Sequence, residues 1–412
     1  MNVSYFIAKR LATSKEYKNS VSAPIIKIAI AAVILSMIMI IVSIGTGTGL
    51  QIKIREKISS FAGHITISNF DNNQTDITLT PINKHQVFYP KFQDVPEVKS
   101  IQPIATKAGV VRTNETFEGI VFKGVDKNYH WDFLKDFLTQ GKMPSYKENS
   151  ISNEVILSEY LANRLKIKVG DKIQTYFMKS SAEEMPFIRG FDVVGLFNSG
   201  MSQFDESLVF GDLKQVQRMN RWNENEIGAF ELLVNDFEKI EEVNNKVYES
   251  IPSELDTTPI TQKFISIFEW MKLFDTNIYI ILILMILVGT INMIVALMVL
   301  ILERTKMIGI LKALGTSNWS IRKVFVYQAT YILLYGLFFG NVIGIGLLLI
   351  QDYFKIIKLD PSQYHVKEAP VNIDVFSILS INILFIIVCY TVMLLPSYII
   401  TKISPIQAIK ND

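Results

Sequence analysis

The stretch IYIILILMILVGTINMIVALMVLIL, residues 278–302, decides the fold class of this chain. It carries no charged residue and is longer than the about 20 apolar residues that cross a hydrocarbon core of about 30 Å. Three further runs pass the same length test, from about Ile25 to Ile44, Val324 to Ile350 and Val375 to Leu395. With 49% hydrophobic residues in 412 and a mean hydropathy of +0.28, the chain is predicted to have four transmembrane helices.

The first run could be mistaken for a secretory signal, because basic residues precede it. No small-residue cleavage pattern follows; Gly45, Gly47 and Gly49 lead straight into an amphipathic stretch. The sequence therefore predicts an uncleaved anchor. The glycine run itself lacks the preceding strand and the Lys-Ser/Thr ending of a phosphate loop, which favours a flexible or close-packed helix end.

Charge predicts the orientation of the spans. Basic residues dominate three segments: before Pro24, between the second and third runs, and after Leu395. They are Lys9, Arg10, Lys15, Lys18, Arg304, Lys306, Lys312, Arg322, Lys323, Lys402 and Lys410, against Glu16, Glu303 and Asp412. By the positive-inside rule both termini and the 303–323 loop are predicted to be cytoplasmic.

The long insert after the first run is then external, and its pattern predicts an α+β domain. Expected strands are His64 to Ser68, Phe117 to Gly124, Lys172 to Phe177, Phe191 to Phe197 and Ala229 to Val234; expected helices are Ser158 to Leu165, with Ser158 as a possible N-cap, and Glu238 to Ser250.

The fold class is therefore an α+β membrane protein, with a large α+β periplasmic domain inserted between helices 1 and 2. The predicted organisation is 1–49 N-terminus and helix 1, 50–275 periplasmic domain with helical stalks, 276–302 helix 2, 303–323 cytoplasmic loop, 324–351 helix 3, 352–374 short periplasmic loop, 375–396 helix 4 and 397–412 cytoplasmic tail.

Both edges of the external domain have helical periodicity. Leu50, Ile54, Ile58 and Phe61 recur at helical intervals after the first span, and Phe264, Ile267, Phe268, Met271 and Phe274 do so before the second. These segments are either ordinary packing helices or stalks that carry movement between membrane and domain.

Nothing in the sequence indicates a catalytic centre. No GxSxG or HExxH signature occurs, and the four histidines show no ligand spacing. The single cysteine, Cys389, excludes a disulfide or a thiolate cluster within one chain. If the chain carries out transport that needs energy, that energy must come from a partner.

The loop ERTKMIGILKALG, residues 303–315, is where such a partner could act. Met307, Ile308, Leu311 and Leu314 fall on one helical face, and Gly315 is a C-terminal cap candidate. This short amphipathic helix either lies on the lipid surface or fits a groove of a cytoplasmic protein, with Arg304, Lys306 and Lys312 as its polar rim.

This loop resembles the E-R-T-x-x-I-G-x-L-K-A-L-G element of the permease superfamily that contains MacB, FtsX and the Lol lipoprotein-releasing proteins. In that family the element is the coupling helix that docks on the ATPase, which implies this role for Glu303, Arg304, Lys306, Met307, Ile308, Gly309, Leu311, Lys312, Leu314 and Gly315. The tail also resembles the family, with Pro396 followed by Ser404, Pro405, Ile406, Gln407, Ala408 and Ile409, as does the opening Phe6 to Arg10. The resemblance covers essentially the whole chain.

Within the superfamily the external domain is most similar to the Lol branch (LolC/LolE), over Ile156 to Ser158, Val169 to Lys172, Phe191 to Gly195 and Ser199 to Asp205. MacB carries its ATPase on the same chain, and FtsX usually has a smaller external region. A MacB-like mechanotransmission exporter and an FtsX-like regulator of cell-wall hydrolysis remain the alternatives.

The resemblance implies a permease without an ATPase site, extracting lipoproteins from the inner membrane. It implies as partners a homodimeric cytoplasmic ABC ATPase that uses ATP and Mg, a second permease copy or paralogue, an acylated lipoprotein and a periplasmic carrier, with no nucleic acid and no cofactor or metal on this chain. The cargo sorting signal, and whether the second permease is identical, stay open.

Two candidate sites follow from this reading. Flexible thioethers suit varied acyl chains, so Met37, Met39, Met285 and Met293, with polar Asn292, are predicted to line a lipid cavity between the first two spans, although each could simply pack between helices. Met185, Pro186, Phe187, Ile188 and Arg189, between the strands ending at Phe177 and beginning at Phe191, match the family's carrier-docking hook but are shorter, so a plain hairpin loop is the alternative.

Overall fold

A computed structural model describes residues 23–72, 77–147, 150–178 and 186–404. The chain divides into two compact units. The helical unit comprises residues up to 51, 270–358 and 368 onward; the second unit comprises residues 52–269 and 359–367. Each unit is considered by itself below.

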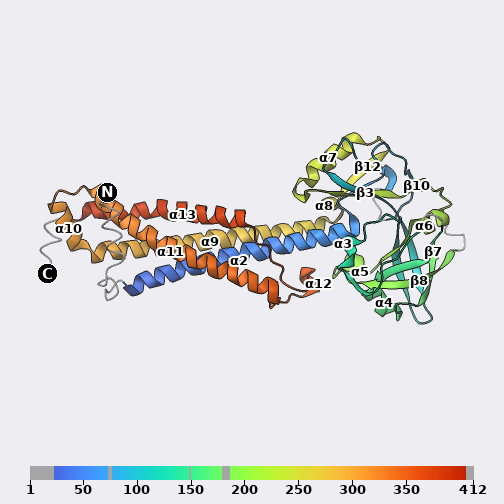
Figure 1. The fold of residues 1–412 in the computed structure, drawn as a ribbon, viewed down its shortest axis with the longest axis horizontal. Helices are drawn as coiled ribbons and strands as arrows, with labels where there is room; N and C mark the ends of the chain where they lie inside the picture. The colour runs from blue at the N-terminus through green and yellow to red at the C-terminus, as the bar shows by residue number, and fades with distance from the viewer. Residues whose placement is uncertain (1–22, 73–76, 148–149, 179–185, 405–412) are drawn as a thin grey trace. The chain divides into compact units, whose positions relative to one another are not determined.

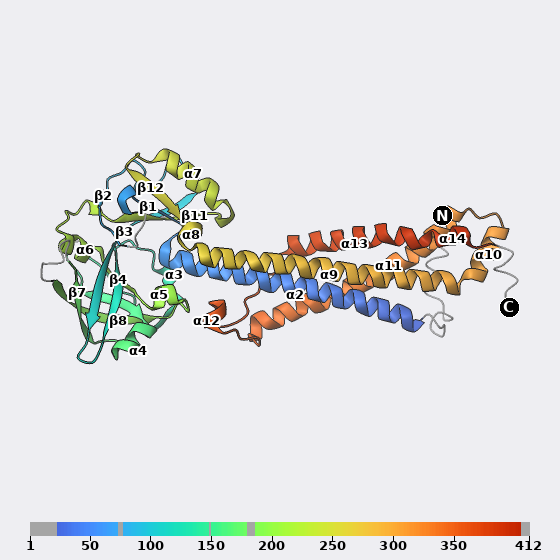
Figure 2. The same ribbon diagram turned by 180° about the vertical axis from the view of Figure 1, so that it is seen from behind.

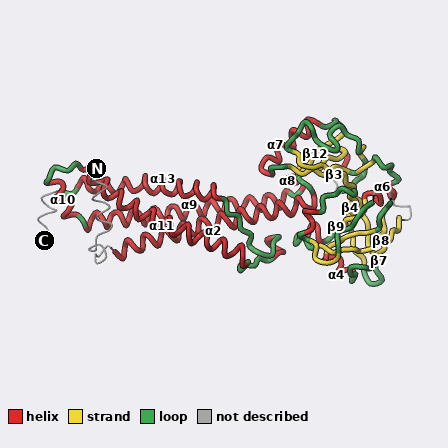
Figure 3. The backbone as a smooth tube through the Cα atoms, in the orientation of Figure 1, coloured by secondary structure: helices red, strands yellow, loops and turns green. Residues whose placement is uncertain are grey.

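Four long helices dominate the helical unit: α2 (Ala23–Ala62), α9 (Ile265–Glu303), α11 (Asn318–Phe354) and α13 (Val375–Ser397). Each is long and apolar enough to cross a membrane. They lie side by side, as Figures 1 and 3 show. At one end α10 (Thr305–Ala313) connects α9 to α11, and α14 (Ile399–Lys402) follows α13. All four predicted runs fall within these helices, so the helix prediction is confirmed.

Both predicted stalk segments are helical and unbroken. α2 continues through Gly45, Gly47 and Gly49 to Ala62, so the prediction of a helix end at these glycines is wrong. The alternative of close packing is correct, because a Cβ on Gly49 would meet the Pro370 carbonyl oxygen at 2.7 Å. On the other side α9 begins at Ile265, well before the predicted span.

A stripe of glycines joins α11 to α2. Gly336, Gly340 and Gly344 recur every fourth residue, and added Cβ atoms would meet, at 2.7 Å, 2.7 Å and 3.2 Å, atoms of α2 side chains. Such small-xxx-small stripes allow membrane helices to approach closely. This glycine stripe was not among the features predicted from the sequence.

Polar pairs also bridge the helices. The side-chain amides of Asn341 on α11 and Asn382 on α13 donate to each other at 2.8 and 2.9 Å. Between them, the glycine stripe and this amide pair fix the position of α11 against two neighbours, since an amide left unpaired in an apolar bundle is costly.

The second unit contains twelve strands among its described residues (Figures 1 and 2). The strands are β1 (Ile65–Asn69), β2 (Ile82–Asn83), β3 (Val98–Arg112), β4 (Phe117–Val125), β5 (Leu138–Gly141), β6 (Glu154–Ser158), β7 (Lys172–Phe177), β8 (Phe187–Phe197), β9 (Leu208–Asp212), β10 (Glu226–Ile227), β11 (Ala229–Val234) and β12 (Leu255–Pro259). The α-helices of this unit are α3 (Asp132–Lys135), α4 (Glu159–Leu165), α5 (Ser202–Asp205), α6 (Leu213–Asn220), α7 (Ile240–Ser250), α8 (Ile260–Lys263) and α12 (Pro361–Tyr364). Its 3-10 helices are η2 (Phe70–Asn72) and η3 (Phe237–Lys239). All five predicted strands and both predicted helices are present.

Ten of these strands form one sheet, and pairing among six of them closes part of it into a barrel. β3 pairs with β4, β4 with β9, β9 with β6, β6 with β8, β8 with β7, and β7 returns to β3. The rings of Phe122, Phe177 and Phe191 contact one another in its core, with centroids 5.1–6.2 Å apart. A closed barrel removes the exposed edges that would otherwise pair with other chains.

The long strand β3 connects two parts of this ten-stranded sheet. Its second half closes the barrel, whereas Val98–Ile104 pairs with β11, which continues through β1 to β12 in an antiparallel sheet. α2 leads directly into β1 through Gly63, whose φ of +68° allows the chain to turn sharply at the helix end. The antiparallel part of the sheet therefore begins where α2 ends.

The helix cap predicted at Ser158 is confirmed, and one predicted strand boundary is not. Ser158 caps α4, its hydroxyl accepting the Leu161 N–H at 3.0 Å, as predicted. One predicted boundary is wrong: β8 begins at Phe187 rather than at Phe191, because Phe187 pairs with Phe177 and extends the hairpin.

Candidate functional site

The helix α10 ends as the sequence predicts. Gly315 has φ +83°, its N–H donates to the Lys312 carbonyl, and the Thr316 N–H donates to the Leu311 carbonyl, both at 3.0 Å. These two bonds form a Schellman motif, which only a residue tolerant of the left-handed conformation closes without strain. Gly315 therefore terminates α10, as expected.

The two faces of α10 differ in exposure. Ile308 is fully buried, and Met307 and Leu311 pack against the bundle core. Ile310 and Leu314 are 52% and 78% exposed. The prediction that Leu314 shares the apolar face of Ile308 is therefore corrected: that face serves the chain's own helices, and Ile310 with Leu314 forms the outward one.

The predicted polar rim is divided in the same way. Lys306 is exposed, and Arg304 lies 4.0 Å from Glu303. Lys312 instead turns inward: its ammonium donates to the carbonyls of Ile400 at 2.6 Å and Ile403 at 2.8 Å. A cation beside the last carbonyls of a helix is favourable, so Lys312 ties α10 to α14.

Arg322 at the start of α11 reinforces this junction. Its guanidinium donates to the Ser397 hydroxyl and the Leu394 carbonyl, both at 3.1 Å, and stacks near the rings of Trp319 and Tyr398. The basic residues that predicted the orientation therefore also hold α10, α11 and the end of α13 together. Sequence reasoning did not foresee this second role.

The five predicted lipid residues are not gathered on one surface of the single chain. Met37 and Met293 are fully buried in the bundle, and Met285 packs against its core. Met39 is 42% exposed, and the Asn292 amide donates to the Val288 carbonyl of its own helix at 2.9 Å. A lipid cavity lined by these residues stays a prediction.

The predicted carrier-docking segment forms part of a hairpin. Phe187, Ile188 and Arg189 lie on β8, where Arg189 pairs with Thr175, so placing them in a loop is wrong. Pro186 precedes the strand and is exposed, and Met185 lies outside the described residues. Ile188 is 52% exposed, and the Arg189 guanidinium lies 5.8 Å from the centre of the Phe187 ring.

A groove beside this hairpin was not foreseen. Its cavity of about 490 Å³ lies between the hairpin and the end of α6, and is lined by Met178, Phe187, Met219, Trp222 and Leu79 with Lys107 and Arg221 at its edge. Met178 and Leu79 are 66% and 65% exposed. Thioether and aromatic side chains of this kind adapt to varied apolar partners.

Among the described residues, four helices long and apolar enough to cross a membrane accompany a folded α+β unit. A family model of the MacB-like periplasmic core domain matches residues 28–249, and one of the FtsX-like permease C-terminal domain matches residues 279–405. The first match alone covers more than half of the chain, so the protein belongs to the MacB/FtsX-like permease family.

Named relatives cover nearly the whole chain. The lipoprotein-releasing system transmembrane protein LolC of Xylella fastidiosa is 21% identical over 373 residues, and that of Buchnera aphidicola 24% over 377, each covering 87% of both chains. The corresponding LolE of Haemophilus influenzae is 23% identical over 428 residues and covers 100% of both.

Proposed function

We infer that this chain is the permease subunit of a Lol-type ABC system, which extracts lipoproteins from the inner membrane and passes them to a periplasmic carrier. The observation that carries this inference is the full-length similarity to relatives named LolC and LolE, across both the bundle and the domain. The basic segments favour cytoplasmic termini and a periplasmic α+β domain.

The outward face of α10 is the proposed ATPase contact. Ile310 and Leu314 are exposed on α10, whose opposite face packs against the bundle. These two side chains would fit an apolar groove, with Lys306 beside them. Since Lys312 fixes α10 to α14, a push on α10 would displace the bundle rather than bend the loop. The partner ATPase would supply ATP and Mg²⁺ chemistry.

The cargo explains why shielding is needed. At about 0.8 kcal/mol per buried methylene, exposing one 16-carbon acyl chain to water costs about 12 kcal/mol, and three chains cost about 36. Lipid must therefore move along a continuous apolar route. The outer face of α9, with Ile283, Leu287 and Ile291 each at least half exposed, would supply one wall, and a second permease copy or paralogue the other.

Reconstitution tests the function. The purified chain, its candidate ATPase and a triacylated lipoprotein in liposomes should release the lipoprotein to a soluble carrier only with ATP. Leu314→Asp should lower both ATP-dependent release and ATPase co-purification by more than tenfold, whereas Val87→Asp, which changes an exposed aliphatic residue of the second unit outside the groove, should keep the ATPase bound. ATP turnover without any release would favour a mechanotransmission exporter or a hydrolase regulator instead.

The hairpin and its groove are the proposed carrier contact. Phe187→Ala combined with Arg189→Glu removes the ring that lines the groove and reverses the adjacent charge. We expect the double variant to lose carrier capture in a pull-down while retaining its ATPase. Exposed Tyr248→Ala on α7 is the control, and unchanged capture by the double variant would remove this site from the proposal.

A further inference from the structure

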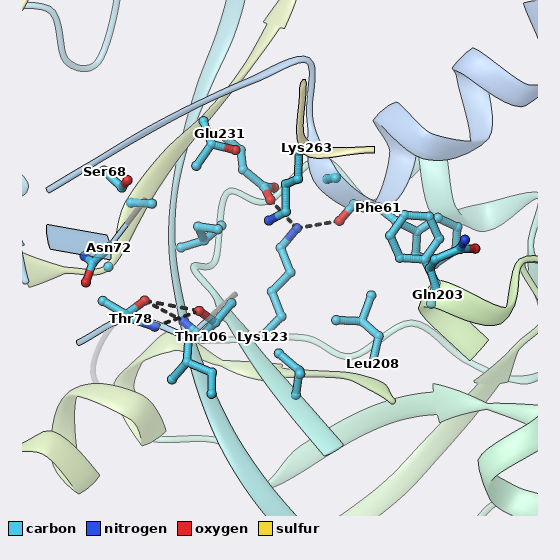
Figure 4. Close-up of a pocket in the computed structure, with 18 of the residues that line it drawn as sticks. Phe61, Ser68, Asn72, Thr78, Thr106, Lys123, Gln203, Leu208, Glu231 and Lys263 are labelled. Carbon is cyan, nitrogen blue, oxygen red and sulfur yellow. Dashed lines mark hydrogen bonds and ion pairs between the residues drawn. The ribbon is translucent and has the colours of Figure 1, made fainter. Parts of the chain in front are cut away.

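A buried lysine joins the sheet of the second unit to the last turn of α2. Lys123 on β4 has 3% of its side chain exposed. Its ammonium donates to the Glu231 carboxylate of β11 at 2.5 Å and to the Phe61 carbonyl at 2.7 Å (Figure 4). Glu231 is itself 9% exposed, so both charged side chains are largely buried.

The Phe61 carbonyl is one of the groups that a helix leaves unsatisfied. Phe61 is the penultimate residue of α2, and the last four carbonyls of a helix have no partner within it. These carbonyls also carry the negative end of the helix dipole, which a cation stabilises. Lys123 therefore caps α2 from a strand distant in the sequence.

The Phe61 side chain is held as firmly as its carbonyl. Its ring is 2% exposed and packs against Phe137, Phe197, Phe204 and Phe210, with centroids 4.9–6.1 Å away. The barrel strands β8 and β9 contribute Phe197 and Phe210. The end of α2 is thus fixed to both the barrel and the antiparallel sheet.

The end of α2 and the start of α9 lie on the wall of the same cavity. This cavity of about 430 Å³ has Phe61, Lys123 and Glu231 on its wall together with Lys263, Phe264 and Ser266 (Figure 4). The Phe264 ring contacts Phe204 at 5.5 Å.

A buried ion pair is a poor means of gaining stability. Desolvation offsets most of its attraction, and apolar residues of similar volume often serve as well or better. Here the cation has a task that an apolar side chain cannot perform, namely holding a helix-end carbonyl. Glu231 then serves to keep that cation charged in a buried place.

We propose that Lys123, held by Glu231, is a positioning residue that fixes the end of α2 in the domain. When α2 is displaced, the barrel and the antiparallel sheet then move together. The proposal rests on the proposed function, in which ATP hydrolysis at a partner moves the membrane helices.

The test uses the complete permease–ATPase complex with Lys123→Met and Glu231→Gln together, which leaves no buried charge unpaired. We expect a melting temperature like that of the unchanged chain and ATP hydrolysis within twofold, but lipoprotein release at least tenfold slower. Lys84→Met with Asp126→Asn is the matched control, because this partly buried pair of the same unit does not touch α2. Release at the unchanged rate in the Lys123 variant would overturn the proposal.

A second measurement does not depend on cargo. Spin labels at exposed Lys53 on α2 and Lys172 on β7, in a Cys389→Ser background, report the distance between helix and barrel. The distribution should broaden in the double variant and stay narrow in the control. If the unchanged chain releases no lipoprotein, the proposed function fails, while this distribution still decides the linkage. Should the double variant unfold, Lys123→Gln with Glu231→Gln, which keeps polar groups at both positions but is too short to hold the Phe61 carbonyl, replaces it and the same two results decide.

Discussion

The glycine stripe of α11 gives the sharpest test of the packing. A Cβ added at Gly340 would lie 2.7 Å from Met37 Cβ and 3.2 Å from the Ile34 carbonyl oxygen. Carbon atoms prefer about 3.5–4.0 Å, and Met37 Cβ is attached to the backbone and cannot rotate away. Gly340→Ala therefore forces α2 and α11 apart by roughly 1 Å.

The magnitude follows from two opposing contributions. Overpacking of a tight interface costs about 1–3 kcal/mol, and a gap of 0.5–1 Å forfeits a quarter to a half of each neighbouring contact. Replacing a helical glycine by alanine returns up to about 1 kcal/mol of helix propensity. The control Gly346→Ala has the same propensity gain but no atom within 4 Å of its Cβ, so it should be neutral or stabilising.

The assay is reversible unfolding of the full chain in one detergent, by denaturant titration. We expect the free energy of unfolding of Gly340→Ala to be about 1–3 kcal/mol lower than that of Gly346→Ala. Gly336→Ala should match Gly340→Ala, and Gly344→Ala should lie between, because its nearest atom is 3.2 Å away. Equal stability of all four variants would refute the claim that this stripe sets the helix spacing.

Three further predictions concern single side chains. Burial lowers the pKa of His64 to about 4, below its usual value of about 6.5. The folded state therefore loses up to about 3 kcal/mol of its free energy of unfolding as the pH falls from 6.5 towards 4. In a pH series of thermal melts, His64→Gln should flatten this decline. Lys57 donates to the carbonyls of Ser199 at 2.7 Å and His365 at 2.5 Å; Lys57→Met should therefore speed hydrogen exchange in residues 359–367, and unchanged exchange would contradict this anchoring role. Lys312→Met should make the chain after Ile400 more sensitive to protease, whereas exposed Lys306→Met should not.

The candidate site was predictable only in part, for reasons that particular residues make clear. Gly315 was identifiable because a left-handed helix end selects glycine almost regardless of context. Leu314 was placed on the wrong face, because periodicity says which residues align along a helix but not where its neighbours lie. Phe187 was assigned to a loop because a strand in a hairpin can extend past its hydrophobic pattern when its partner supplies hydrogen bonds.

The sequence by itself determined the four apolar helices, their extension into the α+β domain and the family. These features rest on length, periodicity and local capping, each of which a few neighbouring residues specify. Only the tertiary structure decided that Lys312 faces inward, that six strands close a barrel, and that Lys123 reaches Phe61. Those outcomes depend on contacts between residues far apart in the chain, where charge or hydrophobicity alone does not name the partner.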